Sequence, residues 1–409
     1  MEVSRMSIRN YLAQKKTLRM ARRALKRAFN AGGIYIAHKN SGGKQIRQYP
    51  RLLDMRPDTE SETFTYVFSL PLGFSPDELR KREYVFRQAF GGNIELGGED
   101  KVFTLTLFNR SNDETIDYNY GDFMRKIHGK KMPIVCGKDK RGQWFTYDMV
   151  TNPYAVIGGV PGSGKSSILR IILTTLILTK KPSELSLYLI DCKRSEFHLF
   201  RNIQHTQALE SDKRGANRIL DELHAEMLDR TKLLEVFGID HIDKLPKEHR
   251  KPYILLCIDE YVMLRDDKLL NAKLIELVAM GRALGIYAIL SMQRPSHKVI
   301  DTTLRDCLDV SMGFKVRNQT SAEILETPGA DKLTKSGQFI IDFRGENTEL
   351  KAPYLDLDVA KELLNVYWRA PKSATNVTPN PAQQVQPDLK KLTDNIFGQD
   401  DENWEDESE

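Results

Sequence analysis

The chain has 409 residues, 40% of them hydrophobic and 29% charged, which predicts two or three globular domains with a sizeable core. No run reaches about 18 apolar residues and no apolar stretch follows the basic N-terminus, which excludes a transmembrane helix and a secretory signal and predicts a cytoplasmic protein. Residues 1–30 carry nine Lys or Arg against one acid. The net charge of the whole chain is +5, and without the seven acids of the last twelve residues it is +12. This charge balance favours a polyanion-binding protein over an ordinary metabolic enzyme.

The first predicted element is a basic helix over residues 6–29, ended by the glycines at 32 and 33. We treat residues 1–30 as a segment of their own. A basic helix fits an anionic membrane surface, the phosphates of a nucleic acid or the surface of a partner subunit. A solvated helix packed against its own domain explains the same pattern.

A small α+β domain is predicted over residues 45–110. Its predicted elements are a strand over 63–70, a helix from Pro76 to Phe90 with Ser75 as its N-cap, and a hairpin of residues 93–96 and 101–108. The domain carries no catalytic constellation, so we expect a structural or oligomeric role.

Residues 111–130 are polar and are predicted to form a linker to a larger domain over residues 130–368. That domain opens with a predicted hairpin of residues 134–137 and 143–148. Beyond it, residues 370–409 are a Pro/Gln linker and an acidic tail, in which no core can form. The tail is either a docking peptide for a basic pocket or a solubilising segment.

The most informative stretch lies between an apolar strand, residues 154–157, and an apolar helix, residues 168–178. It consists of Gly159, Val160, Pro161, Gly162, Ser163, Gly164, Lys165, Ser166 and Ser167. The spacing G-x-x-x-x-G-K-S is that of the phosphate-binding loop: backbone N–H groups surround the phosphates, Lys165 reaches the β- and γ-phosphates, and Ser166 ligates Mg²⁺. A glycine-rich turn that merely joins a strand to a helix is the plainer alternative, and the strand, loop and helix order favours phosphate binding.

Charged or polar residues also follow three later strands, where an open α/β sheet binds its ligands. Strand 185–190 ends in the run Asp191 to Arg194. Strand 253–258 ends in Asp259, which would support Mg²⁺, and Glu260, which could polarise the attacking water. Strand 286–291 is followed by Gln293, which can contact both the γ-phosphate and the water.

The remaining predicted elements of this domain are helices over 215–237 and 268–284 and strands over 309–316 and 338–343. Strands that alternate with helices predict an α/β fold with a mainly parallel sheet and right-handed crossovers.

Taken together, these motifs resemble the FtsK/SpoIIIE DNA translocases. The resemblance covers about residues 130–345 and is carried by segments 159–166, 189–193, 258–261, 281–287, 292–296 and 329–333. It implies a RecA-like P-loop motor domain that uses ATP and Mg²⁺, assembles into a hexameric ring, hydrolyses ATP at subunit interfaces and pumps DNA through its centre.

The resemblance also implies roles for single residues. Lys165 and Ser166 would bind phosphate and Mg²⁺, and Asp259 would support the metal. Glu260 would be the catalytic base, and Gln293 would sense the γ-phosphate. Ser311 and Lys315 depart from the family pattern, so three residues remain open for the arginine that acts on the neighbouring subunit's nucleotide: Arg282, Arg305 and Arg317.

With neither a membrane anchor nor a winged-helix domain after residue 370, the chain is most similar to the FtsK-type proteins of conjugative plasmids and integrative elements. These couple a relaxase-bound strand to a secretion channel, so relaxase and channel proteins are expected partners, with peripheral membrane contact through the basic N-terminus. The leading hypothesis is an ATP-driven DNA translocase in conjugative transfer or partition, with DNA contacts at Arg265, Lys268, Lys273 and Lys298. The alternatives are a protein-secretion ATPase and an ATP-switched adaptor for relaxase or replication proteins.

Overall fold

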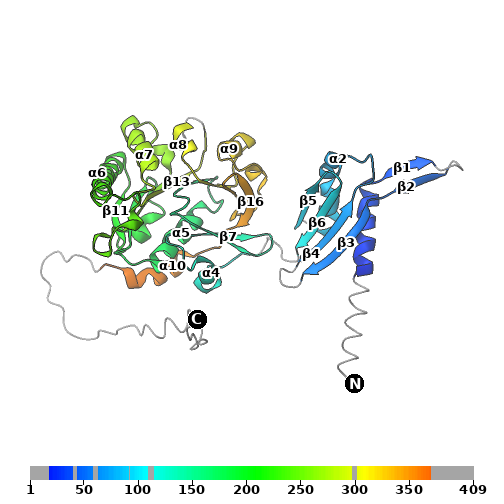
Figure 1. The fold of residues 1–409 in the computed structure, drawn as a ribbon, viewed down its shortest axis with the longest axis horizontal. Helices are drawn as coiled ribbons and strands as arrows, with labels where there is room; N and C mark the ends of the chain where they lie inside the picture. Colours follow the sequence, from blue (N-terminus) through cyan, green and yellow to red (C-terminus); the bar gives the residue numbers. More distant parts are fainter. Residues whose placement is uncertain are drawn as a thin grey trace, which may run out of the picture. The chain divides into compact units, whose positions relative to one another are not determined.

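The computed structural model describes residues 18–39, 44–58, 63–91, 93–108, 115–296 and 302–369. The part of the predicted basic helix before residue 18, the tail over 370–409 and Lys298 lie outside these ranges. The chain divides into two compact units, Met1–Glu114 with Lys140–Gln143 and Thr115–Asp139 with Trp144–Glu409 (Figure 1). In the described ranges, no helix combines the length and the apolar character needed to cross a bilayer.

The first unit is built on a four-stranded antiparallel sheet in the order β3-β4-β6-β5. Its strands are β3 (Arg51–Asp58), β4 (Thr63–Ser69), β5 (Ile94–Glu99) and β6 (Val102–Phe108). Alternate residues of β4 and β6, among them Phe68 and Phe103, point into one apolar core. A helix over residues 18–31 closes this core, so its described part belongs to the unit and is not a separate segment.

A two-stranded antiparallel ribbon, β1 (Ile36–Lys39) with β2 (Gln45–Gln48), follows that helix. The single helix predicted from Pro76 to Phe90 is wrong: the structure has α2 (Pro76–Lys81) and α3 (Glu83–Phe90). The break falls at Arg82, whose guanidinium donates to the carbonyl oxygen of Gly33 at 2.6 Å. This contact joins residues 49 positions apart, so the helical period of the segment does not contain it.

The second unit holds a ten-stranded sheet in the order β11-β10-β12-β13-β9-β14-β15-β16-β7-β8. Neighbours from β11 to β14 are parallel, and neighbours from β14 to β8 are antiparallel. The strands are β7 (Pro133–Asp139), β8 (Trp144–Asp148), β9 (Tyr154–Gly158), β10 (Leu185–Asp191), β11 (Thr206–Glu210), β12 (Tyr253–Asp259), β13 (Ile286–Met292), β14 (Val310–Phe314), β15 (Gln338–Phe343) and β16 (Glu346–Lys351). The predicted α/β fold with a mainly parallel sheet is confirmed.

Helices cover both faces of this sheet (Figure 1). In β9, Ala155 and Ile157 enter the core under α5 (Lys165–Thr179), whereas Tyr154 and Val156 enter the core under α6 (Lys213–Phe237) and α7 (Lys268–Met280). A strand that is apolar on both faces gives a continuous apolar run in the sequence, which is how the central strands were predicted. The helices of the unit are α4 (Tyr120–Ile127), α5 (Lys165–Thr179), α6 (Lys213–Phe237), α7 (Lys268–Met280), α8 (Thr302–Asp306), α9 (Gln319–Ile324) and α10 (Leu357–Leu364).

Two predictions about this unit are wrong in detail. The polar linker predicted over residues 111–130 contains the helix α4. Phe123 and Ile127 are buried on one face of this helix, and most of its other residues are polar. The helix predicted to reach residue 284 ends at Met280, where Gly281 begins a turn closed by a hydrogen bond from the Leu284 N–H to the Gly281 carbonyl oxygen at 3.0 Å.

Candidate active site

The predicted phosphate loop joins the end of β9 to the start of α5. Glycine is required at Gly159 (φ +156°), since a Cβ there would lie 2.7 Å from Cβ of Phe314. It is also required at Gly164 (φ +115°), where a Cβ would lie 3.0 Å from the backbone of Gly337. The two glycines therefore allow the loop to pass close to β14 and to the turn before β15.

Hydrogen bonds between the loop and those neighbours fix its position. The Val160 N–H donates to the Lys315 carbonyl oxygen at 2.8 Å. The Ser336 hydroxyl donates to the Gly162 carbonyl oxygen at 2.9 Å, and the Gly337 N–H donates to the Ser163 carbonyl oxygen at 2.8 Å. Two loop carbonyls are thus engaged from outside, while the first N–H groups of α5 have no intrahelical acceptor and lie at the positive end of the helix.

Two hydroxyl groups of the loop lack partners. The side-chain oxygens of Ser163 and Ser167 are buried and make no hydrogen bond with any described residue. A buried polar group left unpaired costs about 1–3 kcal/mol. Phosphate oxygens are acceptors that would satisfy such groups, so these two hydroxyls fit a site built for an anion.

The ammonium of Lys165 is unusually buried for a lysine, with 6% of the residue exposed. Desolvation lowers the pKa of Lys165 to about 8, although the carboxylates of Asp259 and Glu260 oppose this effect. A nearby phosphate would favour the charged form again. The nearby carboxylates therefore offset the desolvation of Lys165 only in part, and its side chain is placed to bind an anionic ligand.

Sheet register brings the other predicted residues to the same edge. Asp191 of β10 pairs with Asp259 of β12, and Met292 of β13 pairs with Gly158 of β9. Because these strands are parallel, their carboxyl ends meet at one edge of the sheet, next to the phosphate loop. Lys165, Asp259, Glu260 and Gln293, which the sequence analysis selected, are brought together there.

Asp259 is 6% exposed, and burial raises the pKa of its carboxyl group, with the charge of Asp191 adding to the rise. Asp191 itself caps the following turn, since it accepts from the N–H groups of Glu196 and Phe197 at 3.0 Å each. A buried carboxylate beside another carboxylate favours a cation. The Asp259 carboxylate and the Ser166 hydroxyl supply oxygen atoms, the ligand type that Mg²⁺ prefers, and the described residues hold no larger cluster of metal-binding side chains nearby.

Glu260 has the left-handed backbone conformation, with φ 58° and ψ 56°. Lys193 Nζ lies 2.6 Å from its Oε2, and the Gln293 N–H donates to its Oε1 at 3.3 Å. Both carboxylate oxygens are therefore engaged in a residue that is only 7% exposed. A non-glycine residue in this conformation persists where its surroundings hold it, which is typical of functional sites.

Two features of the site were missed from the sequence. Lys193 was noted within a charged run but given no role, although its ammonium contacts Glu260. The backbone N–H of Gln293 binds Glu260, a contact that was not predicted, while the predicted role of the Gln293 side chain stays a prediction. The position of the run directly after a buried strand was the available signal for Lys193.

The structure separates the three candidate arginines. Arg282 precedes β13, is exposed and donates to the Thr151 carbonyl oxygen at 3.1 Å. Arg305 lies on α8, before β14, and its Nε is buried without a partner among the described residues. Arg317 is exposed beyond the carboxyl end of β14, so it alone of the three follows a strand at the edge that carries the phosphate loop.

The candidate DNA contacts also differ in availability. Lys268 and Arg265 are exposed, and Arg265 pairs with the neighbouring Asp266 at 3.4 Å. The ammonium of Lys273 forms an ion pair with Asp221 of α6, and only 18% of its side chain is exposed. Lys273 is thus engaged within its own unit.

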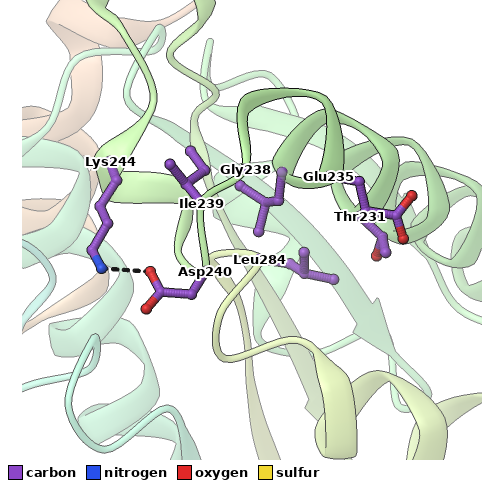
Figure 2. A pocket seen from close by; sticks show the side chains of 8 residues that line it. Thr231, Glu235, Gly238, Ile239, Asp240, Lys244 and Leu284 are labelled. Atoms are coloured by element: carbon purple, nitrogen blue, oxygen red, sulfur yellow. Dashed lines mark ion pairs between the residues drawn. The ribbon is translucent and has the colours of Figure 1, made fainter.

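A separate pocket of about 500 Å³ lies where α6 ends (Figure 2). Gly238, which ends α6, and Leu284, which precedes β13, contribute to its wall, and Asp240 forms an ion pair with Lys244. Since Leu284 precedes β13 and Gln293 follows it, this pocket lies at the opposite edge of the sheet from the phosphate loop. It contributes nothing to the site described above.

Comparison with known proteins agrees with this architecture. Residues 125–255 match the model of the FtsK/SpoIIIE family. The DNA translocase FtsK of Tropheryma whipplei is 30% identical over 236 residues, which are 53% of this chain and 32% of that protein. The chain spans about a third of the length of the curated relatives it matches.

Two solved structures have a similar fold. The conjugation coupling protein TcpA of pCW3, in a monomer form with ATPγS, has a TM-score of 0.57 at 21% identity and covers 83% of this chain and 97% of its own. The cytoplasmic domain of the type VII secretion ATPase EccC of Thermomonospora curvata has a TM-score of 0.53 at 20% identity and covers 62% of this chain and 33% of its own. The second unit therefore shares its fold with these two proteins, and residues 125–255 within it match the FtsK/SpoIIIE family model.

Proposed function

We propose that this chain hydrolyses ATP and uses the energy to move DNA, because residues 125–255 match the FtsK/SpoIIIE family model and the second unit shares the fold of a conjugation coupling protein. The observation that carries the proposal is the convergence of Lys165, Asp259 and Glu260 at one sheet edge beside an open phosphate loop. A binding loop alone would hold a nucleotide. A loop together with a buried, positioned carboxylate supports hydrolysis.

The loop and Lys165 bind the phosphates. Backbone N–H groups at the start of α5 and the hydroxyls of Ser163 and Ser167 donate to phosphate oxygens, and the ammonium of Lys165 neutralises the charge that develops during transfer. Ser166 and Asp259 would hold Mg²⁺, which neutralises negative charge on the β- and γ-phosphates when bound.

Glu260 is the proposed general base. Its carboxylate accepts a proton from water as the water oxygen bonds to the γ-phosphorus, and the bond to the β,γ-bridging oxygen breaks to release ADP. The contacts from Lys193 and from the Gln293 N–H orient the carboxylate. The side chain of Gln293 is proposed to sense the γ-phosphate.

DNA is the proposed track, in conjugative transfer or partition of a mobile element. Support comes from the net charge of +12 before the acidic tail, from the DNA translocases among the relatives and from the coupling protein among the similar structures. We also propose a hexameric ring, in which one of the three candidate arginines completes the neighbouring site, and contacts to relaxase or channel proteins. On this proposal the motor domain spans residues 130–368.

The test is steady-state ATP hydrolysis by the full chain, measured without polymer and then with single-stranded DNA, with duplex DNA and with unfolded polypeptide. We expect DNA to raise turnover severalfold and polypeptide to leave it unchanged. Stimulation by polypeptide alone would instead identify a protein-secretion ATPase. Nucleotide binding with no hydrolysis under any of these conditions would identify an ATP-switched adaptor.

A further inference from the structure

The helix over residues 18–31 carries a one-sided positive charge. Its five cations are all exposed, and the helix contains no acid: they are Arg19, Arg22, Arg23, Lys26 and Arg27. Their spacing of three and four residues places them along one face of the helix. Within the described part of the chain, none of the five forms an ion pair, so the described residues of this unit do not neutralise their charge.

The opposite face of the same helix packs into the core of the first unit. Leu25, Ala28 and Phe29 are at most 3% exposed, and the Phe29 ring packs edge-on against Phe68 and Phe86 at centroid distances of 5.1 and 6.0 Å. An amphipathic helix that binds a membrane must place its apolar face in the lipid. Here Leu25, Ala28 and Phe29 are buried in the unit's core, so the face that carries the five cations is the one left exposed.

The chain after the helix turns the cationic face into a groove. Tyr49, which follows β2, forms a wall with Tyr35, their rings 5.4 Å apart. The Tyr49 hydroxyl donates to Oδ1 of Asn30 at 2.8 Å, and Lys26 Nζ lies 5.6 Å from the Tyr49 ring centre. The result is an open groove of about 500 Å³, lined by Arg23, Lys26, Arg27, Asn30 and Tyr49.

We propose that this basic groove binds the phosphate backbone of a nucleic acid, as a second contact outside the motor domain. Three adjacent cations without acidic partners match a polymer with regularly spaced phosphates, and an aromatic ring and an amide beside them offer stacking and hydrogen-bonding surfaces. The choice of nucleic acid rests in part on the proposed function, since a DNA motor meets this polymer on every cycle. The groove lies in the first unit and needs no nucleotide to form.

The test uses the full chain without ATP and a fluorescein-labelled single-stranded oligonucleotide. Binding is measured by anisotropy over a series of salt concentrations, for the wild type and for the variant Arg23→Gln/Lys26→Gln/Arg27→Gln. Each phosphate contact contributes about 0.7 to the slope of log K against log salt for a single strand. We expect the variant to lose at least tenfold in affinity at low salt and about two units of slope.

A matched variant, Lys232→Gln/Lys247→Gln/Arg250→Gln, removes the same charge from exposed positions of the second unit. It should retain the wild-type slope within about half a unit, since these cations lie outside the groove. Equal losses in both variants would show that only the net charge matters and would overturn the proposal. Arg19 and Arg22 lie on the same helix face, so the variant Arg19→Gln/Arg22→Gln should also have a smaller salt slope than the wild type. Thermal unfolding checks that each variant is folded.

Two further measurements distinguish this proposal from a lipid-binding groove and from the proposed motor function. If the groove variant loses binding to phosphatidylserine vesicles while its oligonucleotide slope is unchanged, the partner is a lipid surface and the proposal is wrong. DNA-stimulated ATP hydrolysis tests the proposed function on its own. Wild-type protein that binds the oligonucleotide through the groove, yet hydrolyses ATP without any response to DNA, would refute the motor and leave the groove intact.

Discussion

The two units use charged residues in opposite ways. In the second unit, Lys165, Asp259 and Glu260 are less than 8% exposed and lie where parallel strands end, each within reach of an opposite charge. In the first unit, the cations of helix 18–31 are exposed on a helix face without acidic partners in the described residues. Buried and mutually oriented groups suit a chemical step, in which position decides the rate. Exposed groups of one sign suit a polymer that binds through many weak, salt-dependent contacts.

The sharpest test of this comparison is Glu260→Gln, which keeps the size of the side chain and removes the carboxylate of the proposed base. We expect ATP hydrolysis to fall on the order of 10²- to 10⁴-fold, the range typical of a lost general base. Nucleotide binding should persist, because the loop and Lys165 are unchanged, and so should oligonucleotide binding. Phosphate release and nucleotide titration measure the two effects. Near-normal hydrolysis would show that another residue is the base, and Glu235→Gln at an exposed position is the control.

The next largest effect is expected in the first unit. Phe29→Ala empties a site packed by Phe68 and Phe86 and should destabilise that unit by roughly 3–5 kcal/mol. Calorimetry should show one unfolding transition moving to lower temperature while the other stays in place, with polymer-independent hydrolysis retained. Tyr84→Ala, at a position 57% exposed, should shift neither transition appreciably. A parallel loss of hydrolysis in Phe29→Ala would contradict the separation of the units.

A smaller effect is expected from Lys193→Met, which leaves the Glu260 carboxylate with the Gln293 N–H as its remaining contact. Misplacing a reacting group by a fraction of a bond length lowers kcat by on the order of ten- to a hundredfold. KM for ATP should change much less, since Lys193 does not belong to the phosphate loop. Lys193→Arg should recover part of kcat because it restores the ion pair. A change in KM alone would mean that Lys193 binds nucleotide and does not position the base.

The smallest effect is a pH dependence of nucleotide affinity. Burial lowers the pKa of Lys165 to about 8 in the free protein, and bound phosphate favours the charged ammonium. Affinity for ATP should therefore be constant below pH 7 and weaken as pH rises through about 8, by up to tenfold per pH unit. Calorimetry in buffers of different ionisation enthalpy should detect proton uptake on binding near pH 8. Constant affinity up to pH 9.5 would contradict the lowered pKa.

The sequence was most informative about segments whose residue types and spacing are explained by a single structure or function. The loop over 159–166 and the acids after strand 253–258 could be located because a phosphate loop and a buried parallel strand have distinctive patterns. The meeting of these segments at one sheet edge was predictable because parallel strands share the direction of their carboxyl ends.

Contacts between distant residues were not predictable in this way. The break between α2 and α3 at Arg82 depends on the hydrogen bond from its side chain to Gly33, and α4 depends on the burial of Phe123. The spacing of apolar residues within a segment contains neither contact. The engagement of Glu260 by Lys193 joins residues 67 positions apart. The groove in the first unit likewise required the burial of Leu25, Ala28 and Phe29, which decides the face of the helix that remains outside.

The strand order of the second unit has a consequence for when the phosphate loop can first take its folded form during synthesis. Strand β9 leads into the phosphate loop but pairs with β13 and β14. Tyr154 can therefore pair with Ala288 only after another 134 residues have been synthesised. The loop itself is held by Lys315 and by Ser336 and Gly337. During synthesis the chain grows from its N-terminus, so the loop leaves the ribosome long before its supports do. We expect nascent chains that end before residue 337 to be unable to bind nucleotide, so an unfinished chain would not hydrolyse ATP.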